Sequence, residues 1–426
     1  MSSLVTVTID TSGLASPLTR SFGDVGLVGY GITGTDNTVK SFTSLSGVIA
    51  EFGSASAIAK SAEFIFANGV NKIYIVKATS VAGTQEVFSG DGTTKTFTVT
   101  KYLQQGSVVV QVATVTQVEG TDYTVDYGNK KITFLTAPPT GVSNVTVDFD
   151  EISATNYETA LVELERKVAN IVVLAMAFEA ASLLKLKTHV IAATSAGLER
   201  IGVAMLPNGN ADAIVDTQTM ETYLASELMI LMAHNSEQDV AAAVAGAIGR
   251  HEPHISMIMK NVRNIACSRS FTPTELDALL LKQINPLIDP ELIAGAGNYM
   301  GEGFNLSTDV TRKYIDVVRV GHDLAFKIKS SLILTIGNVR ITRSGMSLLK
   351  GYMNAILMIE FKRGVIEGYD SVIPVESLLL IEPSKRSQEE VIAISNIKNG
   401  RELLDLEALF VYSGAVHKLG VKLKFK

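Results

Sequence analysis

Three glycines, Gly29, Gly31 and Gly34, are the residues whose spacing best suits a cofactor site. They match the G-x-G-x-x-G pattern of dinucleotide-binding proteins, and a short apolar run precedes them as a strand would. That pattern holds pyrophosphate only where a helix begins at once, because the free amides of a helix N-terminus bind the phosphate oxygens. Here residues 35–38 predict a turn instead. The glycines therefore favour a strand that exits into a loop, and a nucleotide-binding α/β enzyme using Gly29–Gly34 remains the alternative function.

Two histidines three residues apart, His251 and His254, are the candidates for a metal site. A zinc hydrolase would carry such a pair on one face of a helix. Pro253 lies between them, and proline interrupts a helix. The chain's one cysteine, Cys267, is nearby but has no second thiol to pair with. We therefore expect an exposed polar loop here, with no metal and no cofactor.

The sequence contains no motif for covalent catalysis or phosphoryl transfer. It has no Gly-x-Ser-x-Gly elbow to activate a serine and no phosphate-binding loop ending in Gly-Lys-Ser or Gly-Lys-Thr. The carboxylate pair Glu389 and Glu390 lies beside Lys385 and Arg386, a mixture typical of a solvated loop. We expect no catalytic residue and hence no enzyme.

The two ends of the chain alternate in polarity, which is the period of a half-buried strand. Such a strand presents unpaired backbone groups to a partner edge, so we predict that both strands join copies of the chain. The residues predicted to form inter-subunit strands are Val5, Val7, Ile9, Leu419, Val421, Leu423 and Phe425. The opposite face of the last strand is basic, with Lys418, Lys422, Lys424 and Lys426. These lysines either block aggregation or face an acidic partner.

The composition of the chain limits its partners. It has 426 residues, of which 46% are hydrophobic and 19% charged, enough for two or three domains. The net charge of −6 gives no general case for binding nucleic acid. The mean hydropathy of +0.26 suggests a membrane protein, but the best candidate span, residues 168–184, contains Asn170 and Glu179 and is too short. We expect no stable membrane insertion, no signal peptide and a reducing compartment, with the apolar excess used in subunit contacts.

Strands and helices alternate along the chain, which predicts an α/β layer. Residues 84–150 differ, since short alternating runs separated by turns predict a small all-β module inserted into that layer. The predicted domains are residues 1–20 (arm), 21–83 with 151–300 (α/β domain), 84–150 (insert) and 301–426 (C-terminal domain). The helices expected are residues 45–52, 55–67, 157–168, 180–195, 220–233, 239–249, 274–282, 309–329 and 345–361. The C-terminal strands expected are residues 372–375, 378–381 and 391–397, with residues 403–412 forming a hairpin with the last strand.

Several segments together resemble the contractile tail sheath proteins of phages and related injection machines. Each segment is a weak signal alone, and their order along the chain carries the resemblance. The segments are Gly26–Gly31 with Phe42–Ser44 and Glu51–Gly53, the alanine-glycine helix Ala243–Arg250, the Asn-Pro turn Ile284–Leu287, Lys313–Val320, Arg363–Tyr369 and the lysine-rich terminal strand. The insert at 84–150 is outside the family's common core, so its role is unassigned.

The resemblance implies a fold and a mechanism. The fold would be α/β (α+β), a multi-domain sheath core with mixed sheets and flanking helices, into which the small β domain is inserted. Copies would form stacked, commonly hexameric rings around a tail tube protein, with baseplate and tail terminator proteins as further partners. The terminal strands would complete sheets in neighbouring copies, and contraction would drive the tube into a cell envelope. The chain would then belong to a virion tail assembled in the host cytoplasm; another tail structural protein is the near alternative.

Overall fold

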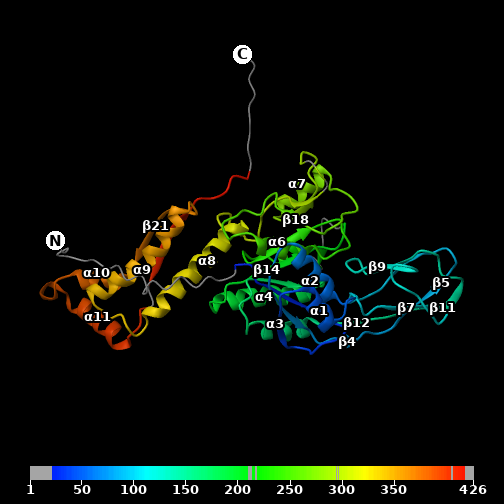
Figure 1. The fold of residues 1–426 in the computed structure, drawn as a ribbon, viewed down its shortest axis with the longest axis horizontal. Helices are drawn as coiled ribbons and strands as arrows, with labels where there is room; N and C mark the ends of the chain where they lie inside the picture. The colour runs from blue at the N-terminus through cyan, green and yellow to red at the C-terminus, as the bar shows by residue number, and fades with distance from the viewer. Residues whose placement is uncertain are drawn as a thin grey trace, which may run out of the picture. The chain divides into compact units, whose positions relative to one another are not determined.

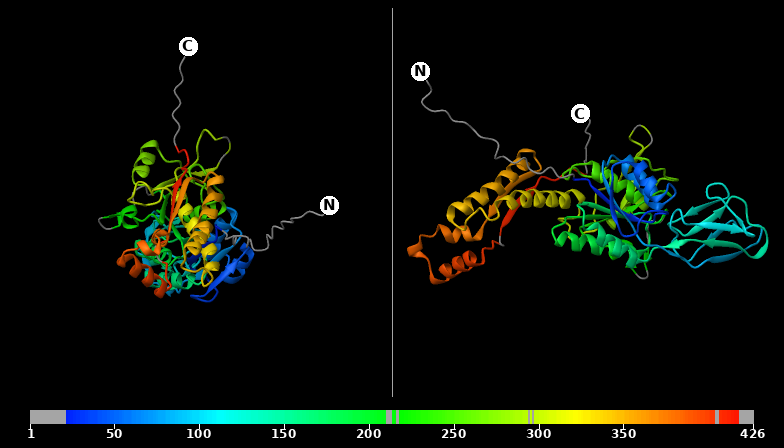
Figure 2. Two further views of the ribbon diagram at one scale, coloured as in Figure 1. Left: turned by 90° about the vertical axis from the view of Figure 1, so that its left-hand side faces the viewer. Right: turned by 60° about the horizontal axis from the view of Figure 1, so that its bottom comes forward.

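We describe the chain from a computed structural model, which covers residues 22–209, 214–215, 218–293, 295, 297–403 and 406–417. These residues divide into two compact units, Phe22–Val318 and residues 319–417. Each unit is described separately below. Figures 1 and 2 show their elements.

The first unit is built on one nine-stranded, mostly parallel sheet. Its strands, in spatial order, are β18 (Asn261–Val262), β20 (Asn298–Met300), β19 (Asn285–Ile288), β17 (Met229–Ala233), β14 (Ile201–Met205), β13 (Ile171–Leu174), β1 (Val25–Gly29), β3 (Ile73–Lys77) and β2 (Val39–Phe42). The strands β1, β3, β13, β14, β17 and β19 are parallel, and β2, β20 and β18 complete the edges in antiparallel pairs. The chain runs outward from β1 to β3 and then crosses to β13, so the strand order reverses between β1 and β13. This is the doubly wound arrangement of an α/β fold.

Helices cover both faces of this sheet, which explains why its central strands are apolar throughout. The helices α2 (Ala57–Ala67) and α6 (Val240–Arg250) pack together, as do α3 (Ala154–Leu164) and α4 (Ala180–Ser195). The first pair crosses very closely at Gly246, where an added Cβ would lie 2.7 Å from the carbonyl oxygen of Ile65. The remaining helices of this unit are α1 (Leu45–Phe52), α5 (Met220–Tyr223) and α7 (Pro273–Leu281).

The all-β module between β3 and α3 is present. Its strands are β4 (Val81–Ala82), β5 (Glu86–Gly90), β6 (Thr96–Thr98), β7 (Val109–Val112), β8 (Val115–Thr116), β9 (Tyr123–Asp126), β10 (Lys131–Phe134), β11 (Gly141–Asp148) and β12 (Asp150–Glu151). They form a three-stranded sheet, a four-stranded sheet and the short ribbon β12–β4 (Figure 2). The apolar core of the module is continuous with the core of the α/β layer, so the insert is packed onto that layer.

The second unit is smaller and mainly helical. Its elements are α8 (Ile315–Leu332, which begins at the end of the first unit), η1 (Ile333–Thr335), α9 (Arg343–Lys362), β21 (Ile366–Val372), α10 (Pro374–Leu380), η2 (Pro383–Lys385), α11 (Gln388–Gly400) and β22 (Glu407–Tyr412). Its two small apolar clusters lie around Leu357 and around Met346.

The first unit also contains a separate two-stranded ribbon, formed by β15 (Ile214–Val215) and β16 (Gln218–Thr219).

The mixed α/β class is confirmed, and most predicted helices form within a few residues of their expected bounds. The helix predicted at residues 220–233 is wrong: it ends at Tyr223, and Met229–Ala233 is the buried strand β17. The strands predicted at residues 372–375, 378–381 and 391–397 are also wrong, since β21 ends at Val372 and the other residues belong largely to α10 and α11. Glu389 and Glu390 do not lie in a loop, because a capping box of Ser387 and Glu390 begins α11 there.

Candidate functional site

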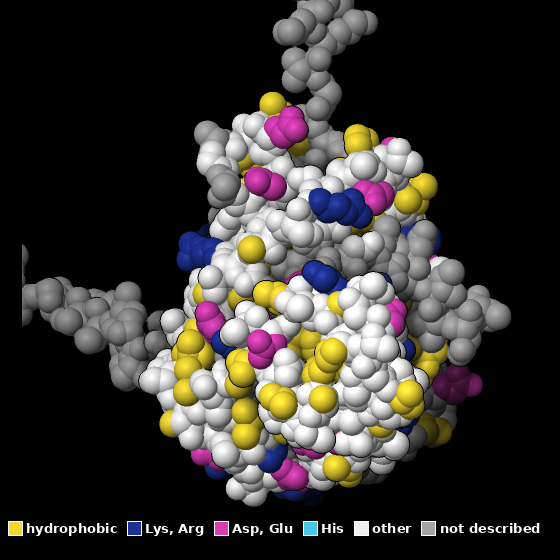
Figure 3. Space-filling view, turned by 90° about the vertical axis from the view of Figure 1, so that its right-hand side faces the viewer, with side chains coloured by type: hydrophobic (Ala, Val, Ile, Leu, Met, Phe, Trp, Pro, Cys, Tyr) yellow, Lys and Arg dark blue, Asp and Glu magenta, His cyan; other side chains and the backbone are white. Residues whose placement is uncertain are grey.

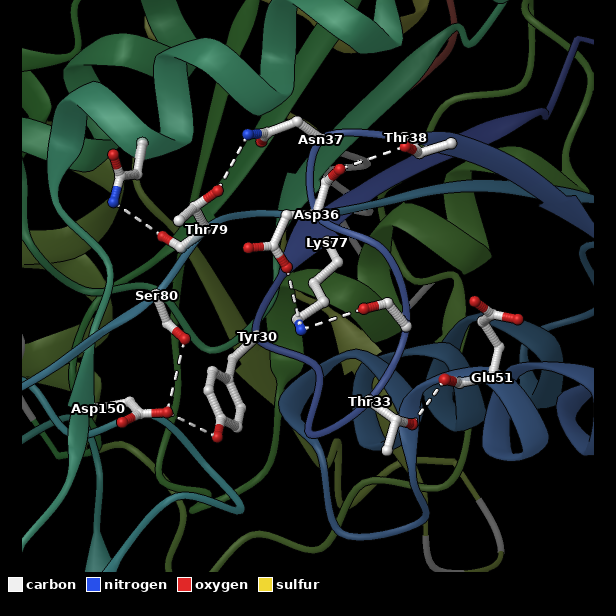
Figure 4. Close-up of polar contacts among 12 residues, drawn as sticks. Tyr30, Thr33, Asp36, Asn37, Thr38, Glu51, Lys77, Thr79, Ser80 and Asp150 are labelled. Atoms are coloured by element: carbon white, nitrogen blue, oxygen red, sulfur yellow. Dashed lines mark hydrogen bonds and ion pairs between the residues drawn. The ribbon is translucent and has the colours of Figure 1, made fainter.

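The glycine-rich segment after β1 is held by contacts within the first unit (Figure 4). The Nζ of Lys77 lies 3.0 Å from a carboxylate oxygen of Asp36 and donates to the carbonyl oxygen of Gly34 at 3.3 Å. Gly34 has a φ of +90°, and a Cβ there would lie 2.9 Å from the ring of Phe52. The glycines therefore allow a tight loop to pack on α1, as expected for a strand that exits into a loop.

Helix α2, whose first turn contacts the start of this loop, has no free N-terminus to receive a phosphate. The amide of Ala57 donates to the carbonyl oxygen of Gln105 at 3.1 Å, and the amide of Ile58 to that of Tyr30 at 3.0 Å. The amide of Ala59 donates to the hydroxyl of Ser56, the N-cap of α2. Because protein groups already accept these hydrogen bonds, α2 lacks the amide cradle that dinucleotide binding requires. This geometry disfavours the nucleotide-binding alternative.

The insert contacts the segments that follow the carboxyl ends of β1 and β13, the kind of place where α/β enzymes usually bind ligands. The ring of Tyr102 stacks on Phe178 with centroids 6.2 Å apart, and the hydroxyl of Tyr30 donates to Asp150 at 2.9 Å (Figure 4). Burial and the neighbouring Asp150 raise the pKa of this hydroxyl. Between β1 and β13, the buried carboxylate of Asp239 accepts hydrogen bonds from Ser61 and from the amide of Met176. These residues fill the crevice with structural contacts.

The other candidates for chemistry are placed separately. α6 ends at Arg250, so His251 and His254 follow the helix and do not share one of its faces. In the described part of the chain, no three histidines, cysteines or carboxylates gather where they could hold a metal ion. The thiol of Cys267 is half-buried, which raises its pKa, and it forms no disulfide with any described residue. None of the helices described here is long and apolar enough to cross a bilayer.

The predicted inter-subunit strands lie outside the described residues. This applies to all of the apolar residues predicted to form them and to the four lysines, as well as to the predicted arm, residues 1–20. The structure instead describes a sheet that such strands could join. That sheet is the two-stranded ribbon of β21 and β22, which we call the ribbon.

The ribbon is antiparallel, from the pair Ile366 and Tyr412 to the pair Val372 and Glu407. A β-bulge follows Ile366, where the register shifts by one residue. Among the described residues, each of its strands pairs only with the other. Each strand therefore has an outer edge whose amides and carbonyls have no described strand to pair with, which makes the ribbon an acceptor for added strands.

The two faces of the ribbon differ. One face packs on the second unit's helices: the ring of Tyr369 meets that of Phe361 edge to face with centroids 5.9 Å apart, and Ser371 donates to Asn354 at 2.7 Å. The other face carries Leu409 and Val411, which are 50% and 58% exposed. Since a two-stranded ribbon alone is marginally stable, helix α9 supports it from the packed face.

A buried ion cluster fixes the helices beneath the ribbon. The Nζ of Lys327 on α8 lies 2.6 Å from both Asp323 and Glu360, and Arg363 lies 3.1 Å from Glu360. Glu360 on α9 is 3% exposed, so its charge is compensated by these two cations. Burial raises the pKa of Asp323, and Lys327 limits the rise. The cluster joins α8 to α9 at the end of α9 that leads into β21.

The outward face of the insert offers no comparable site. Figure 3 shows this face with single apolar side chains separated by uncharged polar groups. The exposed apolar residues of the insert are Val87, Val109, Val115, Val118, Leu135 and Val142. Scattered apolar residues of this kind are ordinary on a protein surface and indicate no particular partner.

Comparisons with known proteins found similarity to solved structures only. No family model matches the chain, and no curated protein does. The helical sheath of the anti-feeding prophage in its contracted state matches with a TM-score of 0.61 and 11% identity, over 100% of this chain and 99% of that one. A chain of that prophage's baseplate matches with a TM-score of 0.61 and 10% identity, over 99% and 98%. The sheath tail protein of Desulfitobacterium hafniense matches with a TM-score of 0.54 and 10% identity, over 83% and 91%. The chain therefore has the fold of contractile tail sheath proteins.

Proposed function

We propose that this chain is a structural subunit of a contractile tail sheath. Copies form stacked, hexameric rings around a tail tube and contract to drive the tube through a target envelope. The observation that carries the proposal is the ribbon, whose two outer edges pair with no other strand among the described residues, in a chain whose ends are predicted to be strands. The sheath fold over the whole length of the chain supports it.

The joints between copies are strand additions to the ribbon. The terminal strands, with Val5, Val7 and Ile9 at one end and residues 419–425 at the other, pair with the edges of ribbons in neighbouring copies. A pairing over five residues forms several backbone hydrogen bonds, each worth roughly 0.5–1.5 kcal/mol net. Burying an apolar side chain such as Leu423 adds about 1.5–3 kcal/mol. Single joints of this size are reversible, and their repetition around a ring makes the lattice permanent.

The proposal includes no catalytic step. The work of contraction comes from two packings of one lattice, so neither a nucleotide nor a metal is required. The occupied N-terminus of α2 and the contacts of the insert with the segments that follow β1 and β13 support a structural role. The same proposal places the chain in a virion tail, with the tube, baseplate and terminator proteins as partners and with assembly in the host cytoplasm. In this proposal the four predicted domains are separate functional parts, and the N-terminal arm and the C-terminal strand are the segments that connect copies of the chain.

Deleting residues 417–426 tests the proposal. We expect a folded, soluble chain that no longer polymerises, because one of the two added strands is gone. A matched control carries the same ten residues in an order that clusters the lysines and breaks the alternation, and it should fail to polymerise as well. Circular dichroism shows whether the truncated chain folds, and negative-stain electron microscopy shows whether it forms a polymer. Tubes formed by the truncated chain would overturn the role of this strand.

A second candidate is a subunit of the baseplate. The match to a chain from a baseplate structure favours it specifically, over 99% of this chain. The two functions differ in the polymer that each forms, since a sheath subunit stacks into long tubes whereas a baseplate subunit stops at a single ring. Electron microscopy of the purified full chain separates them.

A further inference from the structure

We propose that the lysine face of the C-terminal strand pairs with an acidic outer face of the ribbon in a neighbouring copy. This inference rests on the proposed function and identifies which face of the added C-terminal strand points outward and what that face contacts. The occupant is the segment Leu419–Lys426, which lies outside the described residues.

The outer face of the ribbon is acidic. Asp370 lies opposite Leu409, and Glu407 lies opposite Val372, so both carboxylates belong to the face that carries Leu409 and Val411. Both are exposed, as is Glu367 at the bulge. Neither strand of the ribbon contains a lysine, arginine or histidine. The ribbon therefore presents carboxylates with no cation of its own strands beside them.

These carboxylates have no counter-charge within the part of the chain that the structure describes. Asp370 accepts a hydrogen bond from the backbone amide of Ser371 at 2.7 Å, and no ion pair is formed by Asp370, Glu367 or Glu407 there. This contrasts with the packed face, beneath which Glu360 is compensated by Lys327 and Arg363. The carboxylates of the outer face can therefore form ion pairs with cations of a neighbouring copy.

The C-terminal strand matches this surface in spacing. Asp370 and Glu407 are diagonal neighbours across the two strands, about 7–8 Å apart by the geometry of an antiparallel pair. Lys422, Lys424 and Lys426 alternate along one face of the predicted strand, about 7 Å apart from one to the next. Along the strand direction the two carboxylates are offset by two residues, as successive lysines are, so a strand added at one edge places a lysine beside the nearer carboxylate and another within reach of the farther one across the neighbouring strand.

The two faces of the added strand also fit. If the lysines point outward, Leu423 and Phe425 point to the packed face and extend the apolar layer that holds Tyr369 and Ala408. The aliphatic stems of the lysines then cover Leu409 and Val411 while their ammonium groups reach the carboxylates. A one-residue slip would place lysines against the helices, so the charges also fix the register. The N-terminal strand has threonines, Thr6 and Thr8, on its polar face and lacks this complementarity.

Charge reversal tests the pairing. D370K/E407K and K422E/K424E/K426E should each raise the concentration needed for polymerisation about tenfold or more, because like charges then face each other. Combining both sets of substitutions in one chain should restore polymerisation to nearly that of the wild type. The control E382K/E389K changes the charge equally on exposed residues away from the ribbon and should polymerise normally. Light scattering measures the concentration, and circular dichroism confirms that each variant folds.

A gentler pair of substitutions covers the case in which D370K/E407K does not fold. D370N/E407Q removes the charges with little change of shape and should abolish the weakening of polymerisation by salt that the wild type shows. If the combined reversal does not restore polymerisation, or if D370N/E407Q keeps the full salt dependence, the pairing is wrong. These outcomes leave the proposed function standing, because that proposal fails only if the purified full chain forms no tubes or stops at a single ring.

Discussion

Two buried histidines, His189 and His234, are expected to lower the unfolding free energy of the first unit by about 4 kcal/mol together when the pH falls from about 7.5 to about 5. Burial lowers the pKa of His234 to about 4, and burial with the nearby Arg200 lowers that of His189 to about 4, against 6.5 for an ordinary histidine. Below pH 6.5 these two histidines bind protons in the unfolded chain but not in the folded chain. Their contribution to stability is therefore complete above pH 6.5 and falls progressively towards pH 4.

The geometry around His189 explains why it stays neutral. The guanidinium of Arg200, which is fully buried, donates to its Nε2 at 2.8 Å. Arg200 also donates to the carbonyl oxygens of Leu164 and Lys167, where α3 ends. Since an arginine can only donate, Nε2 must carry the lone pair. Protonating His189 would break this bond and place two cations together.

A variant isolates the contribution of His189. H189Q keeps an acceptor for Arg200 but cannot be protonated, so we expect the pH-dependent loss to shrink by about 2 kcal/mol. Urea titrations followed by circular dichroism at both pH values measure the difference. Burial raises the pKa of Asp239, so protonation of this residue at low pH favours the folded state, which is the opposite of the effect of the histidines. Because Asp239 is present in both the wild type and H189Q, its contribution cancels when the two are compared. An identical pH dependence in H189Q, or a direct proton NMR titration of His189 near 6.5, would contradict the account.

Replacing Gly246 by alanine is expected to cost the first unit about 2–3 kcal/mol. The new Cβ would lie 2.7 Å from the carbonyl oxygen of Ile65 and 2.9 Å from the Cβ of Asn68. Both neighbours belong to the backbone or the first side-chain atom of α2 and its cap, so they cannot move aside without separating α2 from α6. Thermal unfolding followed by circular dichroism should show a lower melting temperature.

Gly351 offers a control of opposite sign. It lies on an exposed turn of α9, and an added Cβ there meets nothing within 4 Å. G351A should therefore raise stability by roughly 0.5–1 kcal/mol, since alanine favours a helix over glycine. If G246A were as stable as the wild type, the close crossing of α2 and α6 would be wrong. A destabilised G351A would show that the outer side of α9 is occupied.

Local patterns predicted much of the α/β layer. Helix α4 forms over Ala180–Ser195 as predicted, because its apolar residues repeat at helical spacing. Strand β17 was missed because Met220, Leu224 and Leu228 precede it at helical spacing and its own five residues are all apolar. A fully buried parallel strand has no alternation, so its period cannot distinguish it from a buried helix.

The ribbon was only partly predictable. The strand within residues 403–412 is confirmed as β22, but its described partner is β21. The polar Glu367 and Asp370, the glycine at 368 and the bulge hide the alternation of β21. A signal for its start was present in Gly364, whose φ of +73° ends α9 just before the strand. The start of α11 carries a sequence signal in the capping box of Ser387 and Glu390, but the mixed charges of residues 385–390 favour a solvated loop at the same place.

Hydrogen exchange tests most directly whether copies join through the ribbon. In the monomer, alternate amides of Ile366–Val372 and Glu407–Tyr412 point to the outer edges and should exchange quickly. In the polymer, added strands should slow exchange in these two segments on the order of 100-fold, while β13 at the centre of the large sheet stays as it was. Unchanged exchange in both segments after polymerisation would contradict the account.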